Sequence, residues 1–334
     1  MDIDAFVVRN APKWNRLSRL ARQRRLTVGE ADELLALHQA TARDLSLVRS
    51  QLPDAEMVGR LSGTLAASRA ALTAPRVARW TVVGEFFTAK LPAALYRARW
   101  WWGLTAVISL LVTVGLGIWL AHDPSARNQI LPPDYVRQVT APGGDFETYY
   151  RSVPARDFAF RVWTNNFFLS WESLFAGILL GLPVLPLLFA NCANVAVDGA
   201  FMVNAGRGDV FFSLILPHGM LEMTSVWVAA GVGLKLGWTI IAPGARSRVT
   251  ALQQEGRIAG VIAIGMMLTL ACSGFIEAFV TPSALPTAVR IGVGAVAELG
   301  FLSYVFILGR RAHHRGEMGD LSAMDQVAEV PAVA

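Results

Sequence analysis

The chain contains little charge and little cysteine. Only 16% of its 334 residues are charged, whereas 54% are hydrophobic, and the mean hydropathy is +0.43. This composition is too apolar for a soluble globular protein of ordinary composition. The two cysteines, Cys192 and Cys272, lie in apolar stretches and show no metal-ligand or disulfide spacing. The sequence therefore predicts a polytopic membrane protein without a disulfide framework.

Recognisable catalytic motifs are also missing. The sequence has no phosphate-binding loop, no Ser/His/Asp grouping and no metalloprotease motif. We expect no N-terminal signal peptide, because the first residues are acidic and then basic and no apolar segment accompanies them. The sequence therefore predicts a protein that is not an enzyme, has no cofactor and no metal, and inserts through its internal spans.

Positive charge is concentrated near the N-terminus. Residues 1–100 contain 16 Lys/Arg and 9 Asp/Glu, a net charge of +7. No aromatic residues are interleaved in the most basic stretch, residues 16–25, so the charge indicates contact with an anionic lipid bilayer and not with nucleic acid. Residues 1–75 show helical spacing of apolar residues and a capping box from Thr27 to Glu30, which predicts a helical cytoplasmic region.

Residues 76–102 form a transition between this region and the spans. Apolar residues such as Phe86 and Phe87 alternate with Arg and Lys, and Trp100, Trp101 and Trp102 follow. This pattern predicts an amphipathic helix in the headgroup layer with an aromatic anchor. The alternative is an ordinary surface helix that packs on the preceding region.

Six apolar stretches follow within residues 103–309, which predicts an all-α membrane domain of about six transmembrane helices. They cover residues 103–121, 164–183, 186–205, 211–241, 257–281 and 288–309. Arg and Lys flank the first stretch, the 242–255 connection and the last stretch, which places both termini in the cytoplasm and the charge-balanced loop 122–161 outside. The tail, residues 310–334, is predicted to be disordered. The third stretch is the weakest, because its asparagines require a sheath of other helices or a re-entrant path.

Ionisable and amide side chains inside these stretches are the candidate functional residues. Each ionisable group at membrane depth costs about 2.5 kcal/mol or more on insertion scales, so it normally faces a protein interior or a wet cavity. The candidate polar core consists of Asn165, Asn191, Asn194, Asp198, His218, Glu222, Glu277 and Glu298. Lys235 is expected to reach the interface as an anchor, Glu277 to reach water, Glu298 to need a partner, and Asp198 to join an interhelical hydrogen-bond network.

His218 and Glu222 stand four residues apart and therefore share one helix face. Three interpretations are open for this pair. It is a hydrogen-bonded pair that fixes the broken start of the fourth span, a proton or substrate contact in transport, or a pair of metal ligands. The spacing alone is a weak metal signal, because no second histidine lies in any span.

Glycines at small-residue spacing predict close helix packing, within one chain or in a homo-oligomer. The packing glycines are Gly177, Gly181, Gly219 and Gly231.

The chain resembles the stage II sporulation protein M family of bacterial integral membrane proteins. The resemblance rests on Asn165-Asn166 with Gly177 and Gly181, on the element 216–222 (Leu-Pro-His-Gly-Met-Leu-Glu), and on the element 276–282 (Ile-Glu-Ala-Phe-Val-Thr-Pro). The N-terminal region resembles the longer, non-sporulation branch. The sporulation member is a membrane scaffold that supports peptidoglycan remodelling with its partners and has no recognised catalytic residues. This chain differs by its N-terminal helical region and its extended 122–161 loop.

The resemblance implies a non-enzymatic, multi-pass scaffold or subunit of an envelope-associated complex in the bacterial cytoplasmic membrane. Its expected partners are the anionic bilayer, other membrane or envelope proteins, and a cytoplasmic protein at the N-terminal helices. One alternative is the membrane subunit of a transporter resembling ABC-type exporter permeases, in which the buried His, Glu and Asp line a path. The other alternative is an intramembrane hydrolase.

Overall fold

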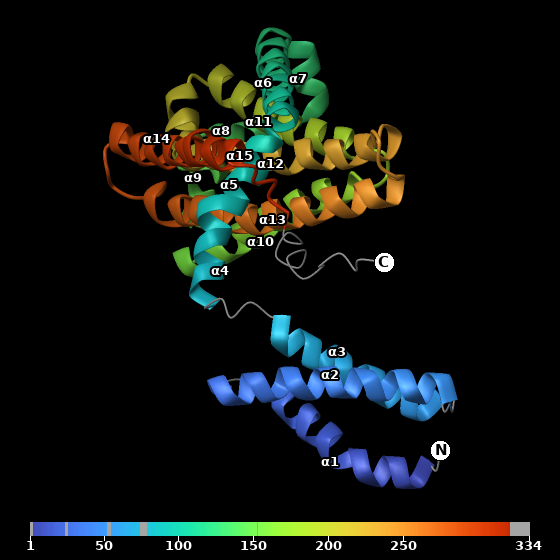
Figure 1. Ribbon diagram of the computed structural model, residues 1–334. Helices are drawn as coiled ribbons and strands as arrows, with labels where there is room; N and C mark the ends of the chain where they lie inside the picture. Colours follow the sequence, from blue (N-terminus) through green and yellow to red (C-terminus); the bar gives the residue numbers. More distant parts are fainter. Residues whose placement is uncertain (1–2, 24–25, 52–54, 74–78, 152, 321–334) are drawn as a thin grey trace. The chain divides into compact units, whose positions relative to one another are not determined.

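The computed structural model describes residues 3–23, 26–51, 55–73, 79–151 and 153–320, and every element within these ranges is helical (Figure 1). The all-α prediction is confirmed. The described chain divides into two compact units, with the boundary between Arg79 and Trp80. We describe each unit by itself.

The first unit contains three helices, α1 (Ile3–Arg22), α2 (Val28–Gln51) and α3 (Ala55–Thr73). Two apolar clusters hold them together, one around Trp14 and Leu61 and the other around Leu17. The predicted capping box is confirmed, because the backbone N–H of Thr27 donates to Glu30 (2.8 Å) and the N–H of Glu30 donates to Thr27 Oγ1 (3.3 Å).

The second unit is a bundle of longer helices with short connecting helices. In chain order the elements are α4 (Arg79–Glu85), η1 (Phe86–Lys90), α5 (Leu91–Arg97), α6 (Arg99–His122), α7 (Pro124–Ile130), α8 (Pro133–Thr140), α9 (Asp145–Thr148), η2 (Tyr149–Arg151), α10 (Ala155–Ala176), α11 (Val184–Asn204), α12 (Gly208–Ile241), α13 (Arg248–Phe275), η3 (Ile276–Val280), α14 (Thr287–Ser303), η4 (Tyr304–Gly309) and α15 (Arg310–His314). Three of these, η1, η3 and η4, are π-helical turns, and η2 is a 3-10 turn.

Five helices of the described chain are long and apolar enough to cross a membrane. They are α6, α11, α12, α13 with η3, and α14 with η4 and α15. The expected six is therefore an approximate count. The second predicted span corresponds to α10, which carries Asn165, Asn166 and Glu172 and ends at Ala176, short of the predicted end at residue 183. The third predicted span is an unbroken helix, α11.

Helix α12 is the central helix of the bundle. It packs against α6, α10, α11, α13 and α14. In its most apolar window 67% of the residues are buried, against 17% in α6 and in α14. The exposed side of α6 is apolar and includes Leu104, Leu111 and Ile118, which suits contact with lipid. His218, Glu222 and Lys235 therefore lie on the helix that the rest of the bundle covers most.

Two glycines allow α10 and α12 to approach closely. A Cβ atom at Gly177 would lie 2.1 Å from the carbonyl oxygen of Gly233, and one at Gly233 would lie 2.4 Å from the carbonyl oxygen of Ser173. Both distances are far inside van der Waals contact, so only glycine fits at these positions. Further along, Gly181 adopts φ 76°, where the chain turns between α10 and α11.

The segment predicted as an interfacial helix divides into two parts in the structure. Trp80 is 84% exposed, whereas Leu91 and Leu95 are buried against α13, α14 and η4. Arg97 does not face outward, because it pairs with Glu255 of α13. The second part of this segment is thus an element of the bundle, and contact with headgroups stays a prediction for the first part.

The predicted loop 122–161 is largely helical. We call residues 124–151, which form α7, α8, α9 and η2, the cap. The guanidinium of Arg207, just before α12, donates to the carbonyl oxygen of Thr140 (2.9 Å) and pairs with Glu147, and Phe146 stacks on Phe211. These contacts fix the cap against the start of α12, where the candidate residues begin.

Candidate functional site

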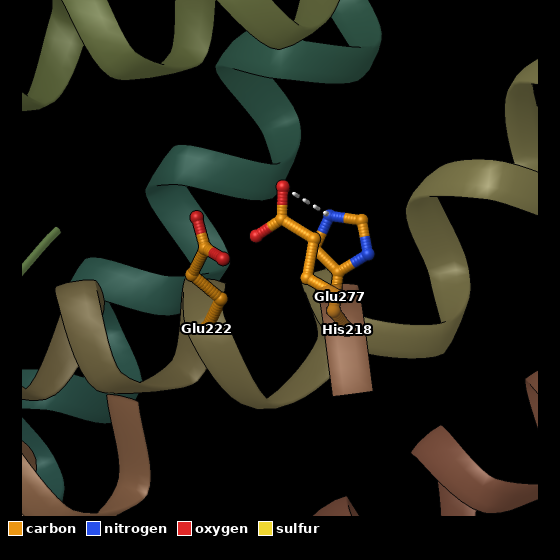
Figure 2. Close-up of side chains that lie close together, drawn as sticks. All are labelled: His218, Glu222 and Glu277. Carbon is orange, nitrogen blue, oxygen red and sulfur yellow. Dashed lines mark ion pairs between the residues drawn. The ribbon is translucent and has the colours of Figure 1, made fainter. Parts of the chain in front are cut away.

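Three of the predicted polar residues meet near the start of α12. His218 and Glu222 project from α12 and Glu277 from the π-helical turn η3 (Figure 2). The nitrogen and oxygen atoms that they offer all lie within 4.8 Å of one another. We call these residues the His218 cluster. His218 and Glu277 are each 5% exposed, so the cluster is built into the protein interior.

The partner of His218 differs from the prediction. Its Nε2 lies 4.0 Å from Oε1 of Glu277, and its Nδ1 lies 3.2 Å from the hydroxyl of Thr281. Among the described contacts no hydrogen bond joins His218 to Glu222. Glu222 instead accepts a long hydrogen bond from Ser273 (3.5 Å). The interpretation of His218 and Glu222 as a hydrogen-bonded pair that fixes the broken start of a span is therefore wrong. Helix α12 runs unbroken through Pro217, and His218 faces Glu277 instead.

Glu277 also differs from the expectation that it would simply reach water. The residue is buried, and its Oε2 is a buried atom for which the described chain provides no hydrogen-bond partner. The π-helical turn at Ile276–Val280 places it there, and such turns occur frequently at functional sites.

A cavity of about 650 Å³ opens beside the cluster. Its wall combines carboxylate, amide, guanidinium, phenol and apolar groups from η2, α10, α12 and η3: Tyr149, Phe158, Arg161, Val162, Thr164, Asn165, Asn166, Phe168, Glu222 and Glu277. The amide of Asn165 also donates to Asn166 (3.3 Å). The cavity can therefore hold a polar or charged group next to two carboxylates.

The cap places aromatic rings beside the cluster. Tyr150 is buried, and the centroid of its ring lies 5.9 Å from that of His218. Burial raises the pKa of the Tyr150 phenol well above its usual value, and the carboxylate of Glu277 raises it further. Burial likewise raises the pKa of Tyr149. Both phenols are thus held in the neutral form, as hydrogen-bonding groups beside the cluster.

Deeper in the bundle the polar cavity gives way to tight apolar packing. The next cavity along α10 has a volume of only about 10 Å³ and is lined by residues such as Leu174, Ala229 and Met266. Beyond it, buried residues of the main core fill the space between α12 and α13, among them Val228, Val232 and Ile262. A second cavity, of about 340 Å³, is lined by Tyr150 and Thr281, both of which contact His218.

The other predicted polar residues do not join the cluster. Asn194 and Asp198 are exposed on α11, and Asn191 is half-buried with a side-chain oxygen that has no described partner. Glu298 of α14 accepts a hydrogen bond from Thr224 (2.9 Å), which is the partner it was expected to need. Of the packing glycines, Gly231 lies against the backbone of Trp102, so that an added Cβ atom would clash with it. A Cβ atom added at Gly219 would approach only the side chain of Ile215.

A second charged group lies near the other end of α12. Lys235 pairs with Glu255 at 2.7 Å, Arg97 pairs with the same carboxylate, and Arg246 approaches it at 3.8 Å. We call these four residues the Glu255 network. Lys235 therefore pairs with the buried carboxylate of Glu255 inside the protein. It does not extend to the membrane interface as the anchor that the sequence predicted.

Sequence reasoning missed Glu255, Tyr150 and Thr281 as site residues. Glu255 was assigned to a connecting loop, and nothing in the sequence links it to Lys235 or Arg97. Thr281 stands four residues after Glu277, so a continuous helix would have placed both on one face. Tyr150 lies in a charged loop that carried no sign of a fold of its own.

Comparison with known proteins agrees with this architecture. The profile of the family described as stage II sporulation protein M matches residues 106–282, more than half of the chain, and this range contains the His218 cluster. The profile of a domain of unknown function (DUF8413) matches residues 4–74, the three-helix unit. No curated protein and no solved structure matches the chain. The chain is a membrane protein that belongs to the stage II sporulation protein M family.

Proposed function

We propose that this protein is a non-enzymatic, multi-pass subunit that holds together an envelope-associated complex in the bacterial cytoplasmic membrane, possessing one docking region on each side. The observation that carries the proposal is the tight apolar packing of the bundle core beyond the polar cavity. A transport subunit needs a polar path through the bundle, whereas here about 10 Å³ of apolar space and then a packed core follow the cavity. A binding site that opens to one side suits a scaffold that receives a partner or ligand.

Two further features support docking on both sides. The cap is an ordered, helical structure that adds surface at one end of the bundle. The three-helix unit is compact, has its own apolar clusters and carries no span-length apolar helix among its described residues. The distribution of Arg and Lys favours a cytoplasmic position for that unit and an external position for the cap.

The orientation is tested with single cysteines. In the background of Cys192→Ser and Cys272→Ser, an impermeant maleimide applied to intact spheroplasts should label Gly143→Cys in the cap but not Arg248→Cys at the start of α13. Both positions should react after permeabilisation. Labelling of Arg248→Cys in intact spheroplasts would overturn the arrangement, and with it the assignment of the two docking regions.

The scaffold role is tested by comparing assembly with activity. Photo-reactive residues at Tyr135 in the cap and at Leu35 on α2, both exposed, should each crosslink to a defined envelope or cytoplasmic protein in native membranes. Glu222→Gln keeps the shape of the side chain and should leave both crosslinks unchanged.

Transport is the second candidate, and it is favoured by the two carboxylates of the His218 cluster, of which Glu277 is buried and Glu222 half-buried. If Glu222→Gln keeps both crosslinks but abolishes function in cells, the charge itself is required and transport replaces the scaffold. A nucleotide-hydrolysing protein crosslinked at Leu35 would point the same way.

A further inference from the structure

We propose that His218, Glu222 and Glu277 bind a divalent transition cation of the zinc class. The site goes beyond the proposed function and stands or falls without it. The three residues supply one imidazole nitrogen and two carboxylate groups from two elements. Zinc takes this mixed set, with three protein ligands and an open fourth position, whereas Mg²⁺ and Ca²⁺ prefer oxygen ligands throughout.

The hydrogen bonds of His218 prepare one ring nitrogen for a metal. When the hydroxyl of Thr281 donates its single proton to the carbonyl oxygen of Ile276 (3.3 Å), it accepts from His218. The proton of the neutral ring is then on Nδ1, which donates to Thr281 Oγ1 at 3.2 Å. The lone pair is left on Nε2, the atom that faces Glu277. Metal-binding histidines are usually oriented in this way, with the other ring nitrogen donating to a fixed acceptor.

The carboxylate of Glu277 supplies the second, independent observation. Its Oε2 is buried and lacks a hydrogen-bond partner among the described residues, and the side chain is more than nine-tenths buried. Leaving such an oxygen without a partner is costly in the protein interior. Glu298 of α14 is half-buried and also has an oxygen without a described partner, but its other oxygen accepts a hydrogen bond from Thr224. Oε1 of Glu277 lies 4.0 Å from Nε2 of His218, so a cation bound by the Glu277 carboxylate would also lie within reach of that nitrogen.

Small side-chain movements suffice to close the site. Tetrahedral coordination at about 2.0–2.2 Å places ligand atoms roughly 3.3 Å apart. The His218–Glu277 distance of 4.0 Å must therefore shorten slightly, and Glu222 must turn toward the pair. Glu222 accepts the long hydrogen bond from Ser273 and a side-chain hydrogen bond from Asn166, and it borders the cavity of about 650 Å³. The fourth position would face that cavity, where water or a ligand group beside Asn165 and Arg161 can enter.

The test measures metal binding to the full-length protein, purified in detergent, treated with chelator and freed of any affinity tag. Equilibrium dialysis against Zn²⁺ should find one tightly bound ion per chain. Co²⁺ should give the intense visible absorption of a tetrahedral site, and Zn²⁺ should abolish it. Millimolar Mg²⁺ or Ca²⁺ should not compete.

Variants assign the ion to the cluster. Glu277→Gln and His218→Gln should each weaken Zn²⁺ binding by about 100-fold or more, since each removes a ligand. Thr281→Val removes only the acceptor of the His218 N–H and should weaken binding by about 10–100-fold. Glu298→Gln, at a half-buried glutamate outside the cluster, and His314→Gln, at an exposed histidine of α15, should bind as the wild type does. Thermal unfolding of each chelated variant checks that it is folded.

Two results would overturn the proposal. One is no zinc above buffer in the wild-type protein, which would make the cluster a pair of carboxylates that share a proton. The other is binding that Glu277→Gln leaves unchanged but His314→Gln abolishes, which would place the ion at α15.

Discussion

Replacing Gly233 by alanine should destabilise the bundle, although alanine is the better helix former. A Cβ atom at Gly233 would lie 2.4 Å from the carbonyl oxygen of Ser173 and 3.3 Å from Cα of Leu174. The obstructing atoms are backbone, so no side chain can rotate away. To restore normal contact α10 and α12 must move apart by about 1 Å.

The magnitude follows from two opposing effects. Overpacking a buried site costs about 1–3 kcal/mol, and a rigid backbone obstacle places the cost at the upper end. The helix propensity of alanine returns up to about 1 kcal/mol. We therefore expect Gly233→Ala to lower the free energy of unfolding by about 2 kcal/mol. Gly260→Ala is the matched control: it lies within α13 and its Cβ would meet no atom within 4 Å, so it should be neutral or stabilising.

Reversible unfolding in mixed detergent micelles, followed by tryptophan fluorescence, measures both variants. Gly177→Ala meets the same contact from the other side, with a Cβ atom 2.1 Å from the oxygen of Gly233. Its effect should be similar in size and not additive with that of Gly233→Ala, because one separation of the helices relieves both clashes. If Gly233→Ala is as stable as Gly260→Ala, the close approach of α10 and α12 is refuted.

Two further predictions concern charged and titratable groups. Glu255→Gln leaves Lys235 and Arg97 without their buried counter-charge and should cost about 3 kcal/mol in the same unfolding assay, whereas Glu172→Gln, at an exposed site, should change it by less than about 0.5 kcal/mol; equal effects would contradict the Glu255 network. In the three-helix unit, burial lowers the pKa of His38 below its usual value near 6.5, and Arg69 lowers it further. The unfolded state therefore takes up the proton first, so the stability that His38 contributes is complete above about pH 6.5 and is lost as the pH falls below it. Hydrogen exchange of α2 and α3, corrected for intrinsic rates, should show this loss between about pH 7.5 and 5.5, and His38→Gln should remove it. The pKa values of Glu30 and Glu33 are lowered, so these two groups change the stability of the unit only below about pH 4.5, outside the range in which His38 is tested.

The fold follows from sequence wherever local rules apply. The capping box of Thr27 and Glu30 and the long apolar helices depend on neighbouring residues, and both are present. The second span was overestimated, because α10 is polar enough to need shelter inside the bundle and lies against α12 and α13. Hydropathy measures the average of a segment and cannot tell which of its faces another helix covers.

The site was predicted in part. His218 and Glu222 were predicted because an ionisable residue in an apolar segment is energetically costly unless it faces the protein interior or a wet cavity. The position of Glu277 depends on the π-helical turn η3, which shifts its side chain relative to a regular helix. That turn has no sequence signature in Ile276–Val280. The pairing of Lys235 with Glu255 depends on the way α12 and α13 fold back on each other, which no local pattern specifies.

The His218 cluster and the Glu255 network account for the ionisable side chains of α12, which are costly to place in a membrane, on the most buried helix of the bundle. His218 and Lys235 are 17 positions apart on α12, hence about 25 Å apart along the helix axis, close to the ~30 Å thickness of a hydrocarbon core. Residues such as Val228 and Val232 fill the interval between them. A helix of this kind places one polar group near each boundary of the membrane and an apolar seal between them. The charge of Lys235 is neutralised within the protein by Glu255, whereas the His218 cluster keeps an unpartnered oxygen beside an open cavity. The asymmetry distinguishes a group that stabilises the fold from a group that is available for binding.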